Sequence, residues 1–526
     1  MRSLCRDMLF GLYGVLWRAA APLLKRHSRL RGDFNLRMHP EQGPFAALRE
    51  LPVAPGRDRP LRLWIQAASA GEARLACALL PTLERAAAGY PYFAARPLHV
   101  LVCTCTRQGL DILADMNSIY GPCPERPAGL RLLSSLMPLD RPDIMREAVR
   151  QAAPDAVILL ETELWPGLLL AAEDVGIPVL LLNARMSKKS ARAYKLTRSF
   201  WRTLAPDRIA AVSEEDARRF ADLFGNPERV AVLPNIKFDP AFPDEESPLP
   251  QGTHAGEQAC DTLCPTLSAS APPPRKTQTD GPSRPASDNA GMSPSCAHLP
   301  TENGPALLFA SVREEEERML LPLVRSLYDE EIQGRHATII IAPRHMHRVA
   351  AWEDGLHAAG LPVQRVSDLQ SDAGRTDLRP VLLLDVFGEL QAAYRAVDAA
   401  FVGGSLAPLG GQNFLEAAGA GVPTLVGPHL DNFLWVGEDV FDAGLVRRVR
   451  DAGELREALL AILTEQTAKL YGTVSIAEAR TAAAAGRRAR FRALIGPKQG
   501  GTLRSARLVL EYLQAYNGAK PRKTFP

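Results

Sequence analysis

The sequence is poor in cysteine for its length and carries almost no net charge. Eight cysteines are scattered over 526 residues, which is not the dense spacing of a disulfide framework, so we expect a reducing, cytosolic setting. The 62 Lys and Arg residues against 59 Asp and Glu residues leave a formal charge of +3. This balance argues against a nucleic-acid-binding surface over the whole molecule.

Several catalytic signatures are also missing. No Asp-x-Asp follows a predicted strand, which disfavours a metal-bridged diphosphate donor, so we expect no metal. The lysine-containing phosphate loop of NTPases and the Gly-x-Ser-x-Gly elbow of hydrolases are absent as well. An ATPase and an α/β-hydrolase are therefore excluded.

Only one long apolar run occurs, and it lies near the amino terminus. Residues 8–24 are apolar except for Arg18, and a basic flank follows up to residue 37. We predict a membrane-associated helix in residues 1–37, spanning or lying in the interface, with the body of the protein on the cytoplasmic side. A cleaved signal peptide and an ordinary amphipathic surface helix remain open as alternatives.

Short β-branched or Leu-rich runs alternate with helical stretches through most of the remaining chain. The predicted strands are 61–67, 98–104, 155–160, 177–183, 208–213, 229–233, 306–310, 337–342, 381–384, 399–402 and 422–426. This alternation predicts two Rossmann-like, doubly wound α/β domains, at residues 38–240 and 305–526. We expect the last helix either to stay with the second domain or to pack back on the first domain.

A Pro- and Ser-rich segment separates the two halves. Residues 241–304 contain few groups that could enter a core, so we expect a flexible insertion. The insertion holds three cysteines and two histidines, namely Cys260, Cys264, Cys296, His254 and His298. Their spacing is poor for zinc, and a zinc knuckle is only a minor alternative.

Polar residues follow the predicted strands of the first half. Glu72 begins a helix after residues 61–67 and is a candidate general base, although a Glu in a first helical turn also complements the helix dipole. Glu161 and Glu163 follow residues 155–160, and buried acids there require a basic partner or a hydroxyl-rich ligand.

A basic stripe begins at Arg185 and Lys188. It continues through Lys189, Arg192 and Lys195, with no acidic residue between 184 and 206. Such a stripe suits phosphates or an anionic membrane surface, and a merely solvated basic face is the alternative.

Three strand ends of the second half carry further candidates. These candidates are Arg344 and His345, then Gly388 and Glu389, and then Asn413 and Glu416. A fixed cation beside a glycine turn can hold a phosphate, and an acid one turn into a helix can bind ribose hydroxyls. The Asn413-x-x-Glu416 spacing also matches a capping box, which needs no ligand.

Taken in order, these motifs resemble those of the Kdo (3-deoxy-D-manno-oct-2-ulosonic acid) transferases of lipopolysaccharide assembly. The matching motifs are Ser-Ala-Gly-Glu (69–72), Glu-Thr-Glu-Leu-Trp-Pro (161–166), Asn-Ala-Arg-Met-Ser (183–187), Lys-Phe-Asp (237–239), Pro-Arg-His (343–345), Gly-Glu-Leu (388–390) and a block at 401–433. The resemblance implies a GT-B glycosyltransferase, in which two Rossmann-like domains face each other across a cleft. It also implies inverting transfer of Kdo from CMP-Kdo to a lipid A precursor, lipid IVA, at the cytoplasmic face of the inner membrane, without a metal or cofactor.

The resemblance also implies roles for individual residues. By its motif, Glu72 resembles the general base of the family. The donor side comprises Arg344, His345, Gly388, Glu389, Asn413 and Glu416, and Glu161, Glu163, Arg185 and Lys188 are expected on the acceptor side.

The chain departs from the family pattern at residues 311–316, at Gln412, where a His is usual, and at Lys189, where an Arg is usual. The alternatives are a GT-B transferase or epimerase that uses a UDP-sugar, and a membrane-tethered nucleotide-binding protein without turnover.

Overall fold

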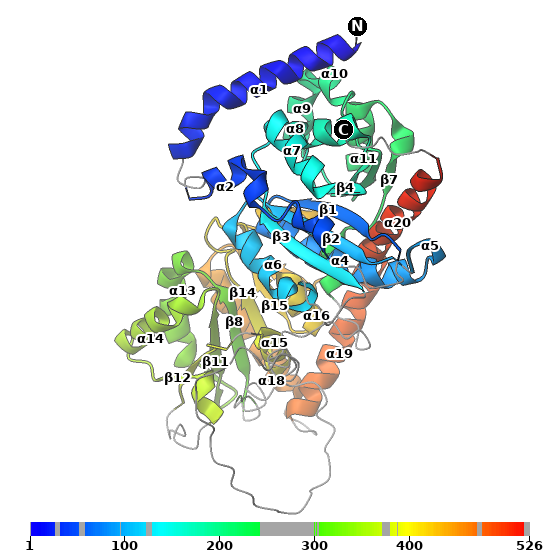
Figure 1. Cartoon of the computed structure of the whole chain (residues 1–526). Helices are drawn as coiled ribbons and strands as arrows, with labels where there is room; N and C mark the ends of the chain where they lie inside the picture. Colours follow the sequence, from blue (N-terminus) through cyan, green and yellow to red (C-terminus); the bar gives the residue numbers. More distant parts are fainter. Residues whose placement is uncertain are drawn as a thin grey trace, which may run out of the picture. The chain divides into compact units, whose positions relative to one another are not determined.

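The computed structural model describes two compact units (Figure 1). The described residues are 2–26, 32–51, 58–94, 96–121, 129–241, 299, 301, 304–370, 379–386, 388–470 and 476–519. The first unit contains the described residues up to 241 together with those from 498 onwards, and the second contains those between 299 and 497. The last helix thus belongs to the first unit. Most of the insertion, including the five residues considered for zinc, lies outside the described residues.

A seven-stranded parallel sheet forms the centre of the first unit. Its strands are β1 (Leu61–Ala67), β2 (Leu98–Thr104), β3 (Leu130–Leu136), β4 (Ala156–Leu160), β5 (Val179–Ala184), β6 (Arg208–Ala211) and β7 (Val230–Val232). They lie in the order β3-β2-β1-β4-β5-β6-β7, with every neighbouring pair parallel. The prediction of a doubly wound α/β sheet is confirmed here, while β3 was not predicted.

Helices cover both faces of this sheet, which is why most residues of its inner strands are apolar and buried. The helices are α1 (Arg2–Arg26), α2 (Phe34–Met38), α3 (Ala47–Glu50), α4 (Ala70–Ala88), α5 (Pro91–Ala94), α6 (Arg107–Tyr120), α7 (Pro142–Ala152), α8 (Pro166–Val175), α9 (Lys188–Leu196), α10 (Arg198–Trp201), α11 (Glu214–Phe224) and α20 (Gly501–Ala519). Helices α4, α6 and α20 share one core, and α7, α8, α10 and α11 share the other.

Helix α1 packs on the first unit through one apolar face. Phe10 is buried against Phe200 of α10, with ring centroids 5.4 Å apart. The Tyr13 hydroxyl donates to Oδ2 of Asp140 at 2.8 Å. Asp140 also accepts from the first N–H groups of α8, at Gly167 and Leu168, and burial raises its pKa to about 7. This packing is that of an amphipathic surface helix, which was one of the alternatives in the sequence analysis.

A membrane-spanning helix is not found in the described part of the chain. None of its helices combines the length and the apolar character that crossing a bilayer requires. Whether α1 associates with a membrane stays a prediction.

The second unit repeats the architecture with another seven-stranded sheet. Its strands are β8 (Ala306–Val312), β11 (Thr338–Pro343), β12 (Val363–Arg365), β13 (Val381–Leu383), β14 (Ala399–Val402), β15 (Thr424–Val426) and β16 (Val446–Arg448). Their order is β12-β13-β11-β8-β14-β15-β16, and a small antiparallel pair, β9 (Glu331–Ile332) and β10 (Arg335–His336), stands apart. Its helices are α13 (Glu314–Tyr328), α14 (Val349–Ala358), α15 (Leu390–Ala396), α16 (Phe414–Ala420), α17 (Asp439–Asp442), α18 (Ala452–Leu470) and α19 (Ile476–Ile495).

A buried ion pair ties α19 to the start of this second sheet. Arg480 donates to both carboxylate oxygens of Asp398, at 2.9 and 2.7 Å, and both side chains are less than one-tenth exposed. Asp398 also accepts from the N–H of Ala306, the first residue of β8. The ion pair therefore fixes the position at which β8, the central strand of this sheet, begins.

Candidate functional site

The candidate residues of the first unit lie where its sheet reverses direction. The chain runs from β1 outward to β2 and β3, and then returns to the other side of β1 to form β4. The carboxyl ends of β1 and β4 therefore border the crevice where open α/β sheets bind ligands. Glu72 follows β1, and Glu161 and Glu163 follow β4, so the sequence prediction placed three carboxylates at this crevice.

Glu72 is held in a fixed position in the first turn of α4. Its Oε2 accepts from the N–H of Ala68 at 2.6 Å, and its Oε1 accepts from the hydroxyl of Ser69 at 2.9 Å. The Ser69 oxygen in turn accepts from the Glu72 N–H at 3.3 Å. Burial raises the pKa of Glu72, although the hydrogen bond from Ser69 lowers it. The Ser69 side chain therefore caps the helix, while Glu72 is a desolvated base, and each oxygen of Glu72 keeps a second lone pair.

Glu163 is electrostatically coupled to Glu72. Burial and, to a smaller extent, the charge of Glu72 raise the pKa of Glu163 to about 7, although a hydrogen bond involving Trp165 lowers it. Around pH 7 this group is therefore partly protonated. Coupled carboxyl groups with perturbed pKa values are typical of sites that handle protons.

Glu161 lies at a strained turn and has a basic partner. Its φ of 59° falls in the left-handed region that side chains rarely adopt, and such strain is concentrated at functional sites. Its Oε1 is 2.5 Å from Nζ of Lys237, in the 3-10 helix Ile236–Ala241. The basic partner that buried acids require is therefore Lys237, which the sequence analysis quoted only as part of the Lys-Phe-Asp motif.

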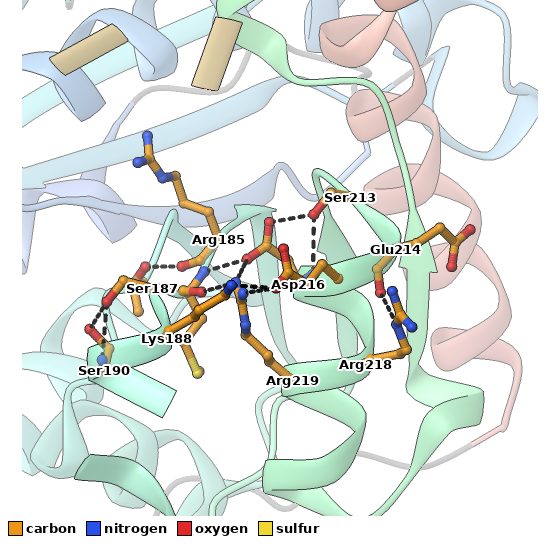
Figure 2. Close-up of polar contacts among 12 residues, drawn as sticks. Arg185, Ser187, Lys188, Ser190, Ser213, Glu214, Asp216, Arg218 and Arg219 are labelled. Carbon is orange, nitrogen blue, oxygen red and sulfur yellow. Dashed lines mark hydrogen bonds and ion pairs between the residues drawn. The ribbon is translucent and has the colours of Figure 1, made fainter. Parts of the chain in front are cut away.

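The turn after β5 carries Arg185 and is clamped by α11 (Figure 2). Asp216 accepts from the N–H of Met186 at 2.8 Å and from the Ser213 hydroxyl at 2.7 Å, while Arg219 donates to the Met186 carbonyl. No described residue forms a hydrogen bond or ion pair with the guanidinium of Arg185, which points away from this network in Figure 2. The clamp thus fixes the backbone and leaves the Arg185 side chain available.

A further hydrogen bond joins this turn to the acidic crevice. The Thr162 hydroxyl, between Glu161 and Glu163, donates to the carbonyl of Arg185. The structure therefore brings the backbone of Arg185 next to the segment that carries Glu161 and Glu163. Lys188 is not part of this group, because it begins α9, is exposed and faces Glu215 of α11 at 3.9 Å.

The basic stripe is less uniform in space than in sequence. Lys195 pairs with Asp222 of α11 at 2.9 Å, just as Lys188 faces Glu215. The interpretation of an uninterrupted cationic face is therefore wrong for these two lysines, because a neighbouring helix supplies the acids that the local sequence lacks. Lys189 and Arg192 are exposed and form no ion pair with any residue that the structure describes.

The second unit has its own reversal point, between β8 and β14. The chain leaves β8 towards β11 and β13 and returns to the other side of β8 as β14. Ser311, near the end of β8, has a φ of 52°. A Cβ atom added to Gly403, directly after β14, would lie only 2.7 Å from the Cα of Val312. Only glycine fits this close approach, so the loop after β14 lies directly against the end of β8.

Arg344 and His345 follow β11, the other neighbour of β8. The Arg344 N–H donates to the carbonyl of Val312 at 2.9 Å, and its Nε donates to Oε1 of Gln412 at 3.1 Å. Burial lowers the pKa of His345, and the nearby charge of Arg313 lowers it further. Gln412, one of the departures from the family pattern, therefore orients a predicted donor-binding cation.

The remaining donor-side candidates lie on two further loops. Asn413 caps α16 by accepting from the Leu415 N–H at 3.3 Å, and its amide donates to Glu416 at 2.7 Å. Helix capping at Asn413, the alternative in the sequence analysis, is therefore observed. Gly388, with a φ of 83°, and the buried Glu389 precede α15.

Potential metal ligands do not cluster in the part of the chain that the structure describes. No group of three or more His, Cys, Asp or Glu side chains there is arranged to hold a metal ion. As a class, the molecule is an α/β enzyme with an acidic site in one doubly wound unit and a basic site in the other.

Comparisons with known proteins narrow this class. Residues 38–240 match the family described as 3-Deoxy-D-manno-octulosonic-acid transferase (kdotransferase). A 3-deoxy-D-manno-octulosonic acid transferase from Bordetella pertussis is 31% identical over 486 residues, covering 90% of this chain and 96% of that protein. One from Chlamydia pneumoniae is 27% identical over 383 residues, covering 72% of this chain and 71% of that protein. The chain belongs to this family, the Kdo transferases, and is therefore a glycosyltransferase.

One solved structure of the family covers part of the chain. The C-terminal CMP-Kdo binding domain of WaaA from Acinetobacter baumannii is 28% identical and covers 36% of this chain and 90% of that domain, with a TM-score of 0.29.

Proposed function

We propose that this protein transfers Kdo from CMP-Kdo to the glucosamine disaccharide of a lipid A precursor, lipid IVA, with inversion at the anomeric carbon. Family membership supports the transferred sugar. The observation that carries the mechanism is Glu72, a buried carboxylate with a raised pKa at the reversal point of the first sheet. A base of this kind can deprotonate a hydroxyl group at neutral pH.

In the reaction, Glu72 accepts the proton of an acceptor hydroxyl while the oxygen attacks the ketosidic carbon of Kdo. The bond between that carbon and the phosphate oxygen breaks, and its electron pair leaves with CMP. Attack on the face opposite the leaving group inverts the configuration. General-base assistance of this type supplies about 10²–10⁴-fold in rate.

The other residues divide between the two substrates. Arg344, His345, Gly388, Glu389, Asn413 and Glu416 bind the donor. Glu161, Glu163, Arg185 and Lys188 serve the acceptor, where Arg185 can meet a phosphate of the lipid and the two carboxylates can meet sugar hydroxyls.

The proposed reaction needs no bound metal. The guanidinium group of Arg344, at the end of β11, supplies the positive charge that a departing phosphate requires. Turnover should therefore be unchanged after exhaustive treatment with EDTA. Loss of turnover that is restored by a divalent cation would contradict this part of the proposal.

The proposed location is the cytoplasmic face of the inner membrane, where the lipid acceptor is held. Val15 and Leu16 on α1 are 58% and 59% exposed, and Leu196 at the end of α9 is 89% exposed. Large apolar side chains beside the exposed cations Lys189 and Arg192 favour the surface of an anionic bilayer. In this proposal α1 lies on the membrane surface.

Incubation of the purified protein with CMP-Kdo and lipid IVA, followed by mass spectrometry of the lipid, tests the proposal. We expect a mass increase of one or more Kdo residues and release of CMP. A parallel incubation with UDP-sugars separates this function from that of a UDP-sugar enzyme. Binding of CMP-Kdo without any lipid product would instead identify a nucleotide-binding protein.

A further inference from the structure

The glycine loop after β14 already has an anionic partner within the chain. Glu316, in the first turn of α13, is completely buried. Its Oε2 accepts from the N–H of Gly404 at 2.6 Å, and its Oε1 accepts from the N–H groups of Ser405 and Leu406, both at 2.9 Å. Three successive N–H groups of this kind form a nest that binds anions. Because Glu316 fills the nest, a donor phosphate must find its positive partners elsewhere.

Arg313 is bound to the same carboxylate as this loop. Its own N–H donates to Oε2 of Glu316 at 3.1 Å, so the carboxylate that holds the loop also holds the backbone of Arg313. Arg344 lies on the adjacent strand end, because its N–H donates to the carbonyl of Val312, the residue before Arg313. Two arginines therefore emerge side by side from β8 and β11 at the reversal point of the sheet.

The charges around His345 agree with this placement. Its pKa is lowered by burial and then by Arg313, Arg344 and His347, in that order of size. The imidazole rings of His345 and His347 are 5.5 Å apart and nearly parallel. The positive charges of Arg313 and Arg344 repel each other, and a bound anion would offset this electrostatic repulsion.

The guanidinium of Arg313 is not fully engaged by the protein. Its Nε is buried without a hydrogen-bond partner among the described residues. Its Nη2 is 3.7 Å from Oε1 of Glu315, beyond hydrogen-bonding distance, and the Arg313 side chain is 28% exposed. The group therefore has free donors and access to solvent.

We propose that Arg313 binds the phosphate of the donor nucleotide together with Arg344, while Glu316 holds the glycine loop and Gln412 orients Arg344. A guanidinium matches two phosphate oxygens at once, and it cannot lose its charge at neutral pH. When the bond to Kdo breaks, the phosphate gains negative charge, so Arg313 stabilises the departing CMP more than the bound donor. This inference rests on the proposed function for the identity of the nucleotide.

Isothermal titration of the full chain with CMP and with cytidine tests the assignment. The variants are Arg313→Gln, Arg313→Lys and, as a matched control, Arg318→Gln, which removes an exposed arginine from the same helix. We expect Arg313→Gln to weaken CMP binding by roughly 10- to 100-fold, the range of a charge-assisted hydrogen bond, and to leave cytidine binding unchanged. Arg313→Lys should restore part of the loss, and Arg318→Gln should bind like the wild type.

The outcomes separate this assignment from the proposed function. If Arg313→Gln binds CMP as the wild type does, the assignment of Arg313 is wrong, even though the wild type may still convert CMP-Kdo and lipid IVA. Equal losses for CMP and cytidine would also overturn it, because they indicate damage to the whole site. If the wild type prefers UMP to CMP and UMP binding still depends on Arg313, the assignment of Arg313 to the phosphate is retained and CMP-Kdo is wrong as the donor.

Discussion

Replacement of Glu72 by Gln tests the proposed base with little change in shape. One Glu72 oxygen accepts from the Ala68 N–H and the other from the Ser69 hydroxyl. In Glu72→Gln the amide oxygen can keep the contact with Ala68, and the amide NH₂ can donate to Ser69, because a hydroxyl also accepts. The start of α4 therefore remains capped, and only the ability to take a proton is lost.

We expect kcat to fall by about 10²–10⁴-fold, the usual contribution of a general base. This loss corresponds to about 2.7–5.4 kcal/mol in activation free energy, at 1.36 kcal/mol for each factor of ten. CMP-Kdo binding, measured by isothermal titration, should be unchanged, and initial rates should be followed as CMP release with lipid IVA in excess.

Ser69→Ala is the matched control, because it removes the cap and retains the carboxylate. Loss of the cap costs about 1 kcal/mol of stability. The Ser69 hydrogen bond lowers the pKa of Glu72, so its removal raises that pKa. Since Glu72 must be ionised to act as a base, the acid limb of the kcat/KM profile should move to higher pH while the maximum rate changes little.

Two results would refute the reasoning. Turnover by Glu72→Gln within about threefold of the wild type lies far below the effect of a general base. An equal loss of turnover in Ser69→Ala, with an unshifted pH profile, would show that Glu72 acts only through the structure of α4.

Three further predictions follow from ion pairs and exposed groups. Arg480→Met leaves Asp398 buried without its cation and should lower the free energy of unfolding by about 3–5 kcal/mol in chemical denaturation, with partial recovery when Asp398 is also replaced by Leu. Lys237→Met removes the positive charge at Glu161, so the pKa values of the acidic crevice should rise and the acid limb of kcat/KM should move to higher pH; an unchanged profile would contradict the coupling. Leu196→Glu should reduce sedimentation with anionic vesicles and leave CMP binding and thermal stability intact, whereas undiminished sedimentation would remove this side chain from the membrane surface.

Most of the strands that could be predicted from the sequence are buried on both faces of a sheet, and the exposed edge strand β7 is the exception. The bounds of β1 and β2 agree with the apolar runs at 61–67 and 98–104. Strand β3 was missed because Ser134 and Ser135 interrupt its apolar pattern, and Ser134 is satisfied by Asn117 of α6, a partner that local sequence does not reveal. The edge strands β12 and β16 are three residues long, and two of the three residues in each are polar, so tertiary pairing alone makes them strands.

The residues of the candidate site could be predicted from the sequence, but their hydrogen-bond and ion-pair partners could not. Strand ends of a doubly wound sheet meet at one edge, and this rule was enough to bring Glu72, Glu161 and Glu163 together. The partners of these residues come from other parts of the chain. Lys237 and Asp216 reach the site from distant elements, and no periodicity in the sequence pairs them with their targets.

The contact between α1 and Asp140 determines how truncated forms of the enzyme must be interpreted. Cutting away the first 24 residues removes the Tyr13 hydroxyl and leaves a fully buried carboxyl group held only by the first two amides of α8. Helix α8 directly follows the Glu-Thr-Glu-Leu-Trp segment, so the acceptor side would be disturbed even in detergent, where attachment to a bilayer is irrelevant. A truncated enzyme that fails therefore reports damage to the catalytic unit, and membrane attachment has to be measured with substitutions at Val15 and Leu16, on the exposed side of an intact helix.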